Sequence, residues 1–396
     1  MAGSIEKRGD SYRLVCVVGY NLQGRPIKKS KTVHCSKKEA KIELAKFVAD
    51  VQKGMYVEGK SLKFTDFIEI WKRDYGSKEL APSTYSRYKG MLDSRILPYF
   101  RHFKLNKIRP IDIMQFYNLL DEDTQITRKK NNNGKKTRKP LSKKTILEHH
   151  RLLHAMLTKA VYWQMIVNNP ADRVQPPKAP KPKRECYDEV QTRILIDNLE
   201  KLTGNDIKYK VAVLLDIFIG ARLGELAGLE WSDIDLKNGI ISINKSSQYL
   251  SDKGIFTKSP KTESSIREVA IPDFIISLLE EYKLWYEEQK SIVGDFWHDS
   301  DRLFVQVDGK PIAPSTISKW FEKFIKQIGL PVITFHGLRH TNATLLIAQQ
   351  IDVATVSARL GHAQITTTYN FYVHPLKSHD KHAGNVLENL LVTNAH

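Results

Sequence analysis

The stretch Thr334-Phe-His-Gly-Leu-Arg-His-Thr341 combines two histidines and an arginine where we expect a helix to begin, with Thr334 as a candidate cap. His336, Arg339 and His340 are spaced three and four residues apart, so their side chains project from about the same helix face. The HxxxH spacing also occurs in metal sites, but it lacks the glutamate of HExxH, and no Cys or carboxylate cluster lies nearby in sequence. We therefore expect no metal here.

A second segment, Gly220-Ala-Arg-Leu-Gly-Glu-Leu226, places an arginine among small and apolar residues at the start of another expected helix. Partial shielding from water strengthens the attraction between an arginine and an anion. The alternative is an ordinary helix pair between Arg222 and Glu225, which contributes roughly 0.2–0.5 kcal/mol. This segment alone leaves both interpretations open.

Two further segments carry groups that can transfer a proton or attack. The candidate hairpin from Lys253 to Pro272 holds lysines at its turn, and a lysine on a turn can reach a neighbouring site as a proton donor, although most such lysines are merely solvated. In Leu360-Gly-His-Ala-Gln, a Gly-His pair stands at an expected helix end, and Tyr372 follows ten residues after His362. That tyrosine is a candidate nucleophile, or simply a buried aromatic residue.

Composition indicates the partner. The chain has 396 residues, and 62 Lys+Arg against 44 Asp+Glu give a net charge of +18. This length suggests two to four domains, and a strongly basic chain with no apolar signal or span of membrane length usually binds nucleic acid. Three scattered cysteines exclude a disulfide framework and a CxxC zinc site, and they favour a reducing cytoplasm.

The chain divides by pattern into an amino-terminal sheet, a helical region and a mixed region. Residues 11–19 and 25–34 read as strands, and residues 37–51 read as a helix that Ser36 caps. Residues 61–175 look helical, with a basic run from Arg128 to Lys144 that we interpret as a DNA-facing loop, the alternative being a solvated, mobile block. The proline-rich residues 176–184 read as a linker.

The combined order of motifs, ARLGEL, PKTESSIR, HGLRHT and LGHAQITTTYNFYVH, resembles the tyrosine recombinase family of phage and conjugative-transposon integrases. The resemblance implies a lambda-integrase-like layout and an α+β, mainly α fold. A small sheet-plus-helix domain for arm-type DNA (1–57) precedes a helical, SAM-like core-binding domain (61–175), the linker (176–184) and a mixed α/β catalytic domain with a carboxy-terminal tail (185–396).

Cleavage of a phosphodiester without a metal requires fixed positive charge around the nonbridging oxygens, and two arginines can supply it. Tyrosine must lose a proton during attack, and the 5′ oxygen must gain one. The resemblance implies a 3′-phosphotyrosine intermediate, so that rejoining needs no ATP, and no phosphate-loop motif is present. The implied catalytic set is Arg222, Lys261, His336, Arg339, His362 and Tyr372, with Lys258 and Tyr369 as the alternatives for the lysine and the tyrosine.

The basic residues expected to contact DNA are Arg13, Lys28, Lys29, Lys31, Arg128, Lys129, Lys130, Lys135, Lys136, Arg138 and Lys139. For the sheet, a merely solvated strand face is an equal alternative. The resemblance further implies a homotetramer on double-stranded DNA, an excisionase and a host DNA-bending protein as partners, no cofactor, and integration and excision of a mobile element in a bacterial cytoplasm. The tail segment 386–392 either docks on a neighbouring protomer or folds back.

Three rival functions remain at this point. A type IB topoisomerase shares the chemistry but relaxes supercoils as a monomer, and the expected arm-binding domain argues against it. A non-catalytic DNA-binding regulator would use its basic residues only to hold phosphate, and the six filled catalytic positions argue against that. A metal-dependent nuclease would lose its activity in EDTA.

Overall fold

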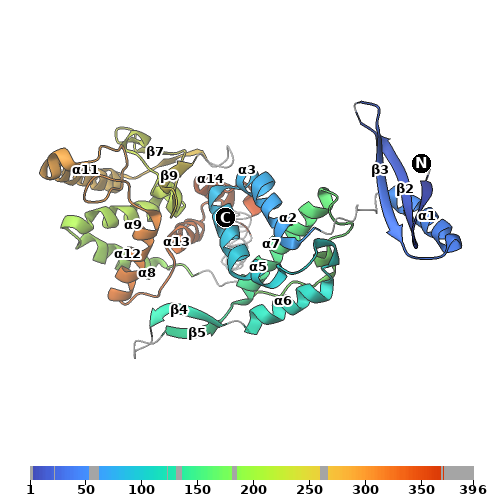
Figure 1. Cartoon of the computed structure of the whole chain (residues 1–396). Helices are drawn as coiled ribbons and strands as arrows, with labels where there is room; N and C mark the ends of the chain where they lie inside the picture. The colour runs from blue at the N-terminus through green and yellow to red at the C-terminus, as the bar shows by residue number, and fades with distance from the viewer. Residues whose placement is uncertain are drawn as a thin grey trace, which may run out of the picture. The chain divides into compact units, whose positions relative to one another are not determined.

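The computed structural model describes residues 3–21, 23–52, 62–122, 124–130, 136–180, 185–258, 266–366 and 369, with the backbone alone for 124–130 and 136–140. The chain forms two compact units, Met1–Lys181 and Pro182–His396. Helices predominate and the sheets are small, which confirms the α+β, mainly α fold class (Figure 1). Within these described residues, no helix is both long and apolar enough to cross a lipid bilayer.

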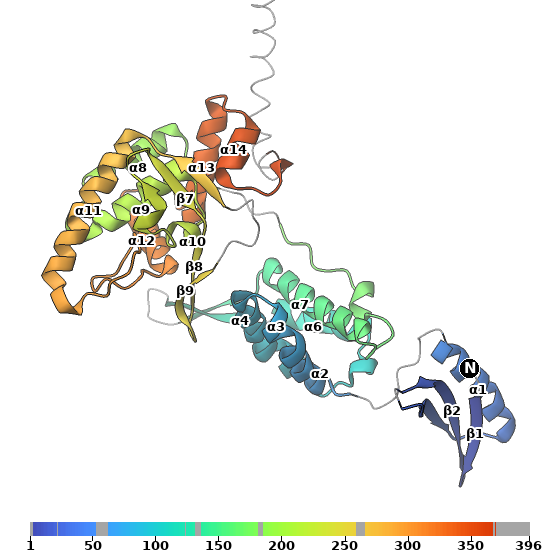
Figure 2. The same ribbon diagram turned by 90° about the horizontal axis from the view of Figure 1, so that it is seen from above.

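The first unit begins with a three-stranded antiparallel sheet covered by one helix. Its strands are β1 (Gly3–Arg8), β2 (Ser11–Tyr20) and β3 (Pro26–Val33), in the order β1-β2-β3, and the helix is α1 (Lys37–Gln52). Leu14 and Cys16 of β2 pack against Phe47 and Ala40 of α1, which lies along one face of the sheet (Figure 2). Ser36 and Glu39 form the predicted cap, because each accepts a hydrogen bond from the other's backbone N–H.

Strand β1 was not predicted. Its sequence, Gly-Ser-Ile-Glu-Lys-Arg, contains one strand-forming residue, Ile5, and its other side chains are exposed. It pairs with β2 across a tight turn in which Gly9 has φ +57°. An edge strand of this kind is specified by its neighbour rather than by its own composition.

The rest of the first unit is mainly helical around an aromatic core. Its helices are α2 (Phe64–Trp71), α3 (Ser77–Glu79), α4 (Pro82–Met91), α5 (Leu97–Phe100), α6 (Pro110–Glu122) and α7 (Lys143–Tyr162), with π-helical turns at Lys72–Gly76 and Leu92–Ile96. Phe64, Phe67, Phe100 and Phe116 are fully or almost fully buried together. The side chain of Ser142 caps α7, which ends at Tyr162.

The basic run between α6 and α7 is not a simple loop, which corrects the sequence interpretation. Strands β4 (Thr124–Lys130) and β5 (Lys136–Pro140) pair antiparallel, with Thr124 opposite Pro140. The β-branched residues of β4 and the Asn133-Gly134 pair between the strands are hairpin signals. The high charge of the run masks these hairpin signals.

The second unit is built around α9 (Ile207–Ile219), whose side chains are buried nearly all round. The elements around it are α8 (Glu189–Glu200), α10 (Leu223–Leu226), β6 (Ile234–Asp235), β7 (Ile240–Ile243), β8 (Ser246–Leu250), β9 (Gly254–Lys258), β10 (Arg267–Ala270), α11 (Asp273–Val293), α12 (Pro314–Gln327), α13 (Phe335–Ala348) and α14 (Val353–Leu360). Helices α8, α11, α12 and α13 all pack on α9 (Figure 1). One antiparallel sheet has the order β10-β7-β6, and β8 and β9 form a separate hairpin.

Two helices of this unit end in glycines with left-handed backbone. Gly220 ends α9 at φ +60°, and Gly361 ends α14 at φ +67°. A Cβ on Gly220 would stand 2.6 Å from Cδ2 of Leu360 and 3.0 Å from Oδ1 of Asn342. The two helix ends therefore pack closely against neighbouring elements, and only glycine combines this backbone with this approach.

Alanine at Gly220 is expected to cost more stability than alanine at Gly329, which has φ +76° and no atom near its Cβ position. Left-handed backbone alone costs about 1–2 kcal/mol, and the steric overlap at Gly220 adds about 1–3 kcal/mol. Denaturant unfolding of the full chain with Gly220→Ala and Gly329→Ala measures the difference. Equal losses would mean that the helix end at Gly220 is loosely packed.

Candidate active site

Arg222 stands at the amino-terminal end of α10 and is held from two directions. Its Nη1 donates to Oε1 of Glu225 at 2.6 Å, and its backbone N–H donates to Oε2 of the same carboxylate at 3.0 Å. Its Nη2 donates to the carbonyl oxygen of Gly361 at 3.1 Å. The predicted helix pair with Glu225 exists, but the bond to Gly361 also joins Arg222 to a segment 139 residues away.

Arg339 lies on α13 and is 2% exposed. Its Nη1 donates to the carbonyl oxygen of Gly220 at 2.7 Å, whereas its buried Nη2 has no hydrogen-bond partner within the described part of the chain. Burial, together with the positive charges of Arg222 and Arg267, lowers the pKa of Arg339 to about 10. At neutral pH the guanidinium stays charged. Among the described residues, the site therefore holds a buried cation with an unused hydrogen-bond donor, Nη2.

Asp216, on α9, is a fully buried acid close enough to Arg339 for the two charges to interact. Burial raises the pKa of Asp216 well above its usual value, and Arg339 is the strongest opposing influence. Neither of its carboxylate oxygens has a hydrogen-bond partner among the described residues.

A third arginine, Arg267 at the start of β10, lies outside the predicted catalytic set. Its side chain is 7% exposed, and its Nη2 donates to Oε2 of Glu225 at 3.0 Å. Burial would raise the pKa of Glu225, but Arg267 and Arg222 outweigh it and hold that pKa below its usual value. Strand alternation could have indicated that Arg267 is buried, because residues two apart on a strand share a face and Val269 is buried.

The two histidines of the predicted set lie at different depths. His362 follows the Gly361 cap and is half-buried, and its pKa is lowered to about 4 by burial and by Arg339 and Arg222. It is therefore neutral at neutral pH. His336 is exposed on the first turn of α13, close enough to contribute to the lowered pKa of His362.

The start of α13 differs in one detail from the prediction. Thr334 occupies the N-cap position, but its side chain makes no capping hydrogen bond. His336 and His340 share a helix face as expected, with ring centroids 4.8 Å apart in a T-shaped arrangement. Within the described residues, no group of three His, Cys, Asp or Glu side chains is placed to hold a metal ion.

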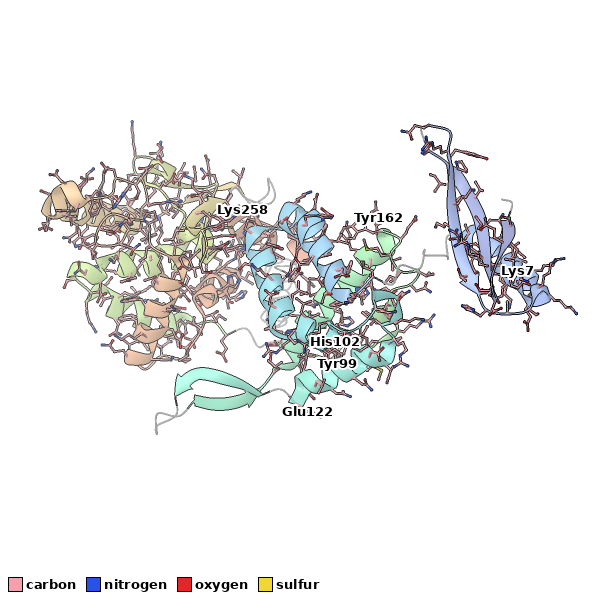
Figure 3. All side chains as sticks on the ribbon, in the orientation of Figure 1. Lys7, Tyr99, His102, Glu122, Tyr162 and Lys258 are labelled. Carbon is pink, nitrogen blue, oxygen red and sulfur yellow. The ribbon has the colours of Figure 1, made fainter. Side chains whose placement is uncertain are left out.

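The structure thus brings Arg222, Arg339, His336 and His362 together. Lys261 and Tyr372 lie outside the described residues. Of their alternatives, Lys258 is the last residue of β9 (Figure 3), and Tyr369 is 51% exposed.

The predicted DNA-contacting residues of the amino-terminal sheet divide between its two faces. In the register of β2 and β3, Lys31 lies opposite Leu14 and Lys29 opposite Cys16, so both lysines belong to the face that α1 covers. Lys31 pairs with Glu43 of α1 at 2.9 Å. Arg13 and Lys28 belong to the open face.

The remaining predicted DNA contacts lie on or beside the β4–β5 hairpin. Arg128, Lys129 and Lys130 belong to β4, and Lys136, Arg138 and Lys139 belong to β5. Lys135 lies outside the described residues. In the register, Lys130 is opposite Lys136.

Comparison with known proteins assigns the chain to a family. Residues 186–379 match the phage integrase family, and residues 63–120 match the SAM-like N-terminal domain of phage integrases. A "Tyrosine recombinase XerC-like" protein of Caldanaerobacter subterraneus subsp. tengcongensis is 28% identical, and the alignment covers 96% of each chain. The "ICEBs1 integrase" of Bacillus subtilis is 27% identical over 95% of this chain and 94% of its own.

Solved structures show the same fold. The Tn1549 transposon integrase in complex with a circular intermediate DNA gives a TM-score of 0.63 at 19% identity, covering 79% of this chain and 95% of that one. A lambda integrase tetramer bound to a Holliday junction gives 0.54 at 17% identity, covering 93% and 94%. With these matches along both units, the chain belongs to the phage integrase family of tyrosine recombinases and is a DNA strand-transferring enzyme.

Proposed function

We propose that this enzyme integrates and excises a mobile genetic element by cutting and rejoining DNA strands at specific sites through a 3′-phosphotyrosine on Tyr372. The observation that carries the proposal is the buried guanidinium of Arg339, whose Nη2 has no partner in the described part of the chain, beside Arg222 and the neutral His362. Such a group is arranged for an anion that replaces the missing partner.

Each residue has a role in one transfer. Arg222 and Arg339 bind the nonbridging oxygens, and neutral His362 donates a hydrogen bond to one of them. His336 takes the proton of Tyr372 as its oxygen attacks phosphorus, and Lys261 protonates the 5′ oxygen as the P–O5′ bond breaks. Rejoining reverses these steps. The phosphotyrosine retains the energy of the broken bond, so no ATP is required, and the two arginines supply the positive charge, so no metal is required.

The amino-terminal parts would bind the DNA. The sheet of residues 1–57 presents Arg13 and Lys28 on its open face to arm-type DNA, and residues 61–175, with the basic hairpin, hold core DNA. The 176–184 segment connects them to the catalytic domain, 185–396. Four protomers would assemble on two core sites in a bacterial cytoplasm, with an excisionase and a host DNA-bending protein as accessory partners.

The nucleophile is tested with a nicked suicide substrate that traps the covalent protein–DNA adduct. Tyr372→Phe is expected to abolish the adduct, because the oxygen that attacks phosphorus is gone, while Tyr369→Phe keeps it. Denaturing gel electrophoresis measures the adduct. Adducts that persist in Tyr372→Phe and vanish in Tyr369→Phe would assign the role to Tyr369.

The arginines are expected to matter more for cleavage than for binding. Removal of one preorganised donor to a transition-state oxyanion typically slows the chemical step about 100–1,000-fold. We expect Arg222→Gln to slow adduct formation by about this factor and to change affinity for core DNA by less than about 3-fold, since one phosphate among many is affected.

Adduct formation by the wild type is expected to persist in EDTA, and its loss there would favour a metal-dependent nuclease.

The two faces of the sheet provide a matched pair for arm binding. Lys28→Gln removes a charge from the open face and is expected to weaken binding of arm DNA and lower the salt slope by about 1. Lys31→Gln removes the same charge from the helix side, where Lys31 pairs with Glu43, and is expected to change both quantities less. Fluorescence anisotropy over a series of salt concentrations measures both, and equal effects would contradict the assignment of faces.

A further inference from the structure

Arg267 forms hydrogen bonds to two parts of the site, α10 and the end of α14, and it is not one of the predicted catalytic residues. Its Nη2 donates to Glu225, whose other oxygen accepts from Arg222. Its Nε donates to the carbonyl oxygen of Arg359 at 2.8 Å, in the last turn of α14. The same guanidinium therefore contacts the acid that orients Arg222 and the helix end that precedes His362.

Packing reinforces these bonds. A Cβ on Gly361 would stand 3.0 Å from Nη1 and 3.1 Å from Cδ of Arg267, so the arginine lies directly against the left-handed cap. Gly361 in turn gives its carbonyl oxygen to Arg222. Arg222, Glu225, Arg267 and Gly361 thus form a closed ring of contacts in which Arg267 is the most buried cation, at 7% side-chain exposure against 41% for Arg222.

The chemistry of the side chain explains why an arginine is needed. Two acceptors from different elements, a carboxylate on α10 and a main-chain carbonyl on α14, are satisfied by separate nitrogens of one rigid plane. A lysine has a single donor atom and cannot reproduce that fork. An uncharged side chain would leave Glu225 buried with one cation instead of two, which frees it to change position.

We propose that Arg267 is a positioning residue that holds two phosphate-binding groups at once, Arg222 through Glu225 and His362 through the end of α14. This inference rests on the proposed function, since it assumes that Arg222 and His362 bind the scissile phosphate. A displacement of such groups by about 1 Å can cost about 100-fold in rate. Arg267 itself acts through its neighbours and does not contact the DNA.

The first experiment measures single-turnover adduct formation on the suicide substrate with Arg267→Lys and Arg267→Gln. Both are expected to slow it about 100-fold, with affinity for core DNA within about 3-fold of wild type. The matched control is Lys208→Gln, which removes another buried cation, from the amino-terminal end of α9, and it is expected to leave the rate within about 3-fold. A rate for Arg267→Lys within about 3-fold of wild type would overturn the proposal.

A second measurement separates positioning from a loss of folding. If Arg267 acts through Glu225, the cost of Arg267→Gln should fall from about 100-fold to below about 10-fold in a Glu225→Gln background, because the bridge is already broken. A methylphosphonate at the scissile position, which removes one anionic oxygen, should likewise shrink the cost of Arg267→Gln, as it should that of Arg222→Gln. Equal costs in every background and on both substrates would indicate a purely structural role and overturn the inference.

Adduct formation by the wild-type protein separates failure of the positioning role from failure of the proposed function. If the wild-type protein forms no adduct on any core DNA, the proposed function fails, and the positioning role fails with it. If the wild type and Lys208→Gln form adducts and the Arg267 variants match them, only the positioning role fails. Thermal unfolding of each variant, with rates measured well below its midpoint, ensures that folded protein is compared.

Discussion

The carboxylate of Glu225 lies between the guanidinium groups of Arg222 and Arg267, and the geometry of the active site depends on that bridge. Arg222 and Arg267 lower the pKa of Arg339 by repulsion, Arg222 does the same to Arg267, and burial adds a desolvation cost for these two buried arginines. Glu225, whose pKa Arg267 and Arg222 hold below its usual value, offsets part of that repulsion. The free protein therefore keeps an excess of positive charge directed at the place where we propose that a phosphate binds.

Main-chain carbonyls at two helix ends complete the arrangement. The last carbonyls of a helix lack partners within it and carry partial negative charge, so they suit cations. Gly220 at the end of α9 accepts from Arg339, Gly361 at the end of α14 accepts from Arg222, and Arg359 accepts from Arg267. Because the protein itself supplies these acceptors, the arginines are oriented in advance and need little rearrangement when an anion arrives.

Sequence motifs pointed to the candidate catalytic side chains more readily than to the contacts that hold them in place. Arg222, Arg339, His336 and His362 could be chosen because their motifs stand in a recognisable order, and the structure brings them together. The role of Arg267 depends on partners 42 and 92 residues away, which spacing cannot reveal. Likewise, β1 is specified by its pairing with β2. The division of the basic residues between the two faces of the sheet follows only from the register of β2 and β3, which places Lys29 and Lys31 on one face and Arg13 and Lys28 on the other. Lys261 and Tyr372 remain predictions.

The long sequence separations within the site bear on how the enzyme is made. Arg222 bonds to Gly361, 139 residues later, and Arg339 bonds to Gly220, 119 residues earlier. During synthesis the amino-terminal unit emerges first and can fold while the second unit is still incomplete. The arginine cluster can close only after α14 has left the ribosome. A chain interrupted before residue 361 thus carries the whole first unit without a complete arginine cluster. During synthesis, this cluster is therefore completed after the first unit has formed.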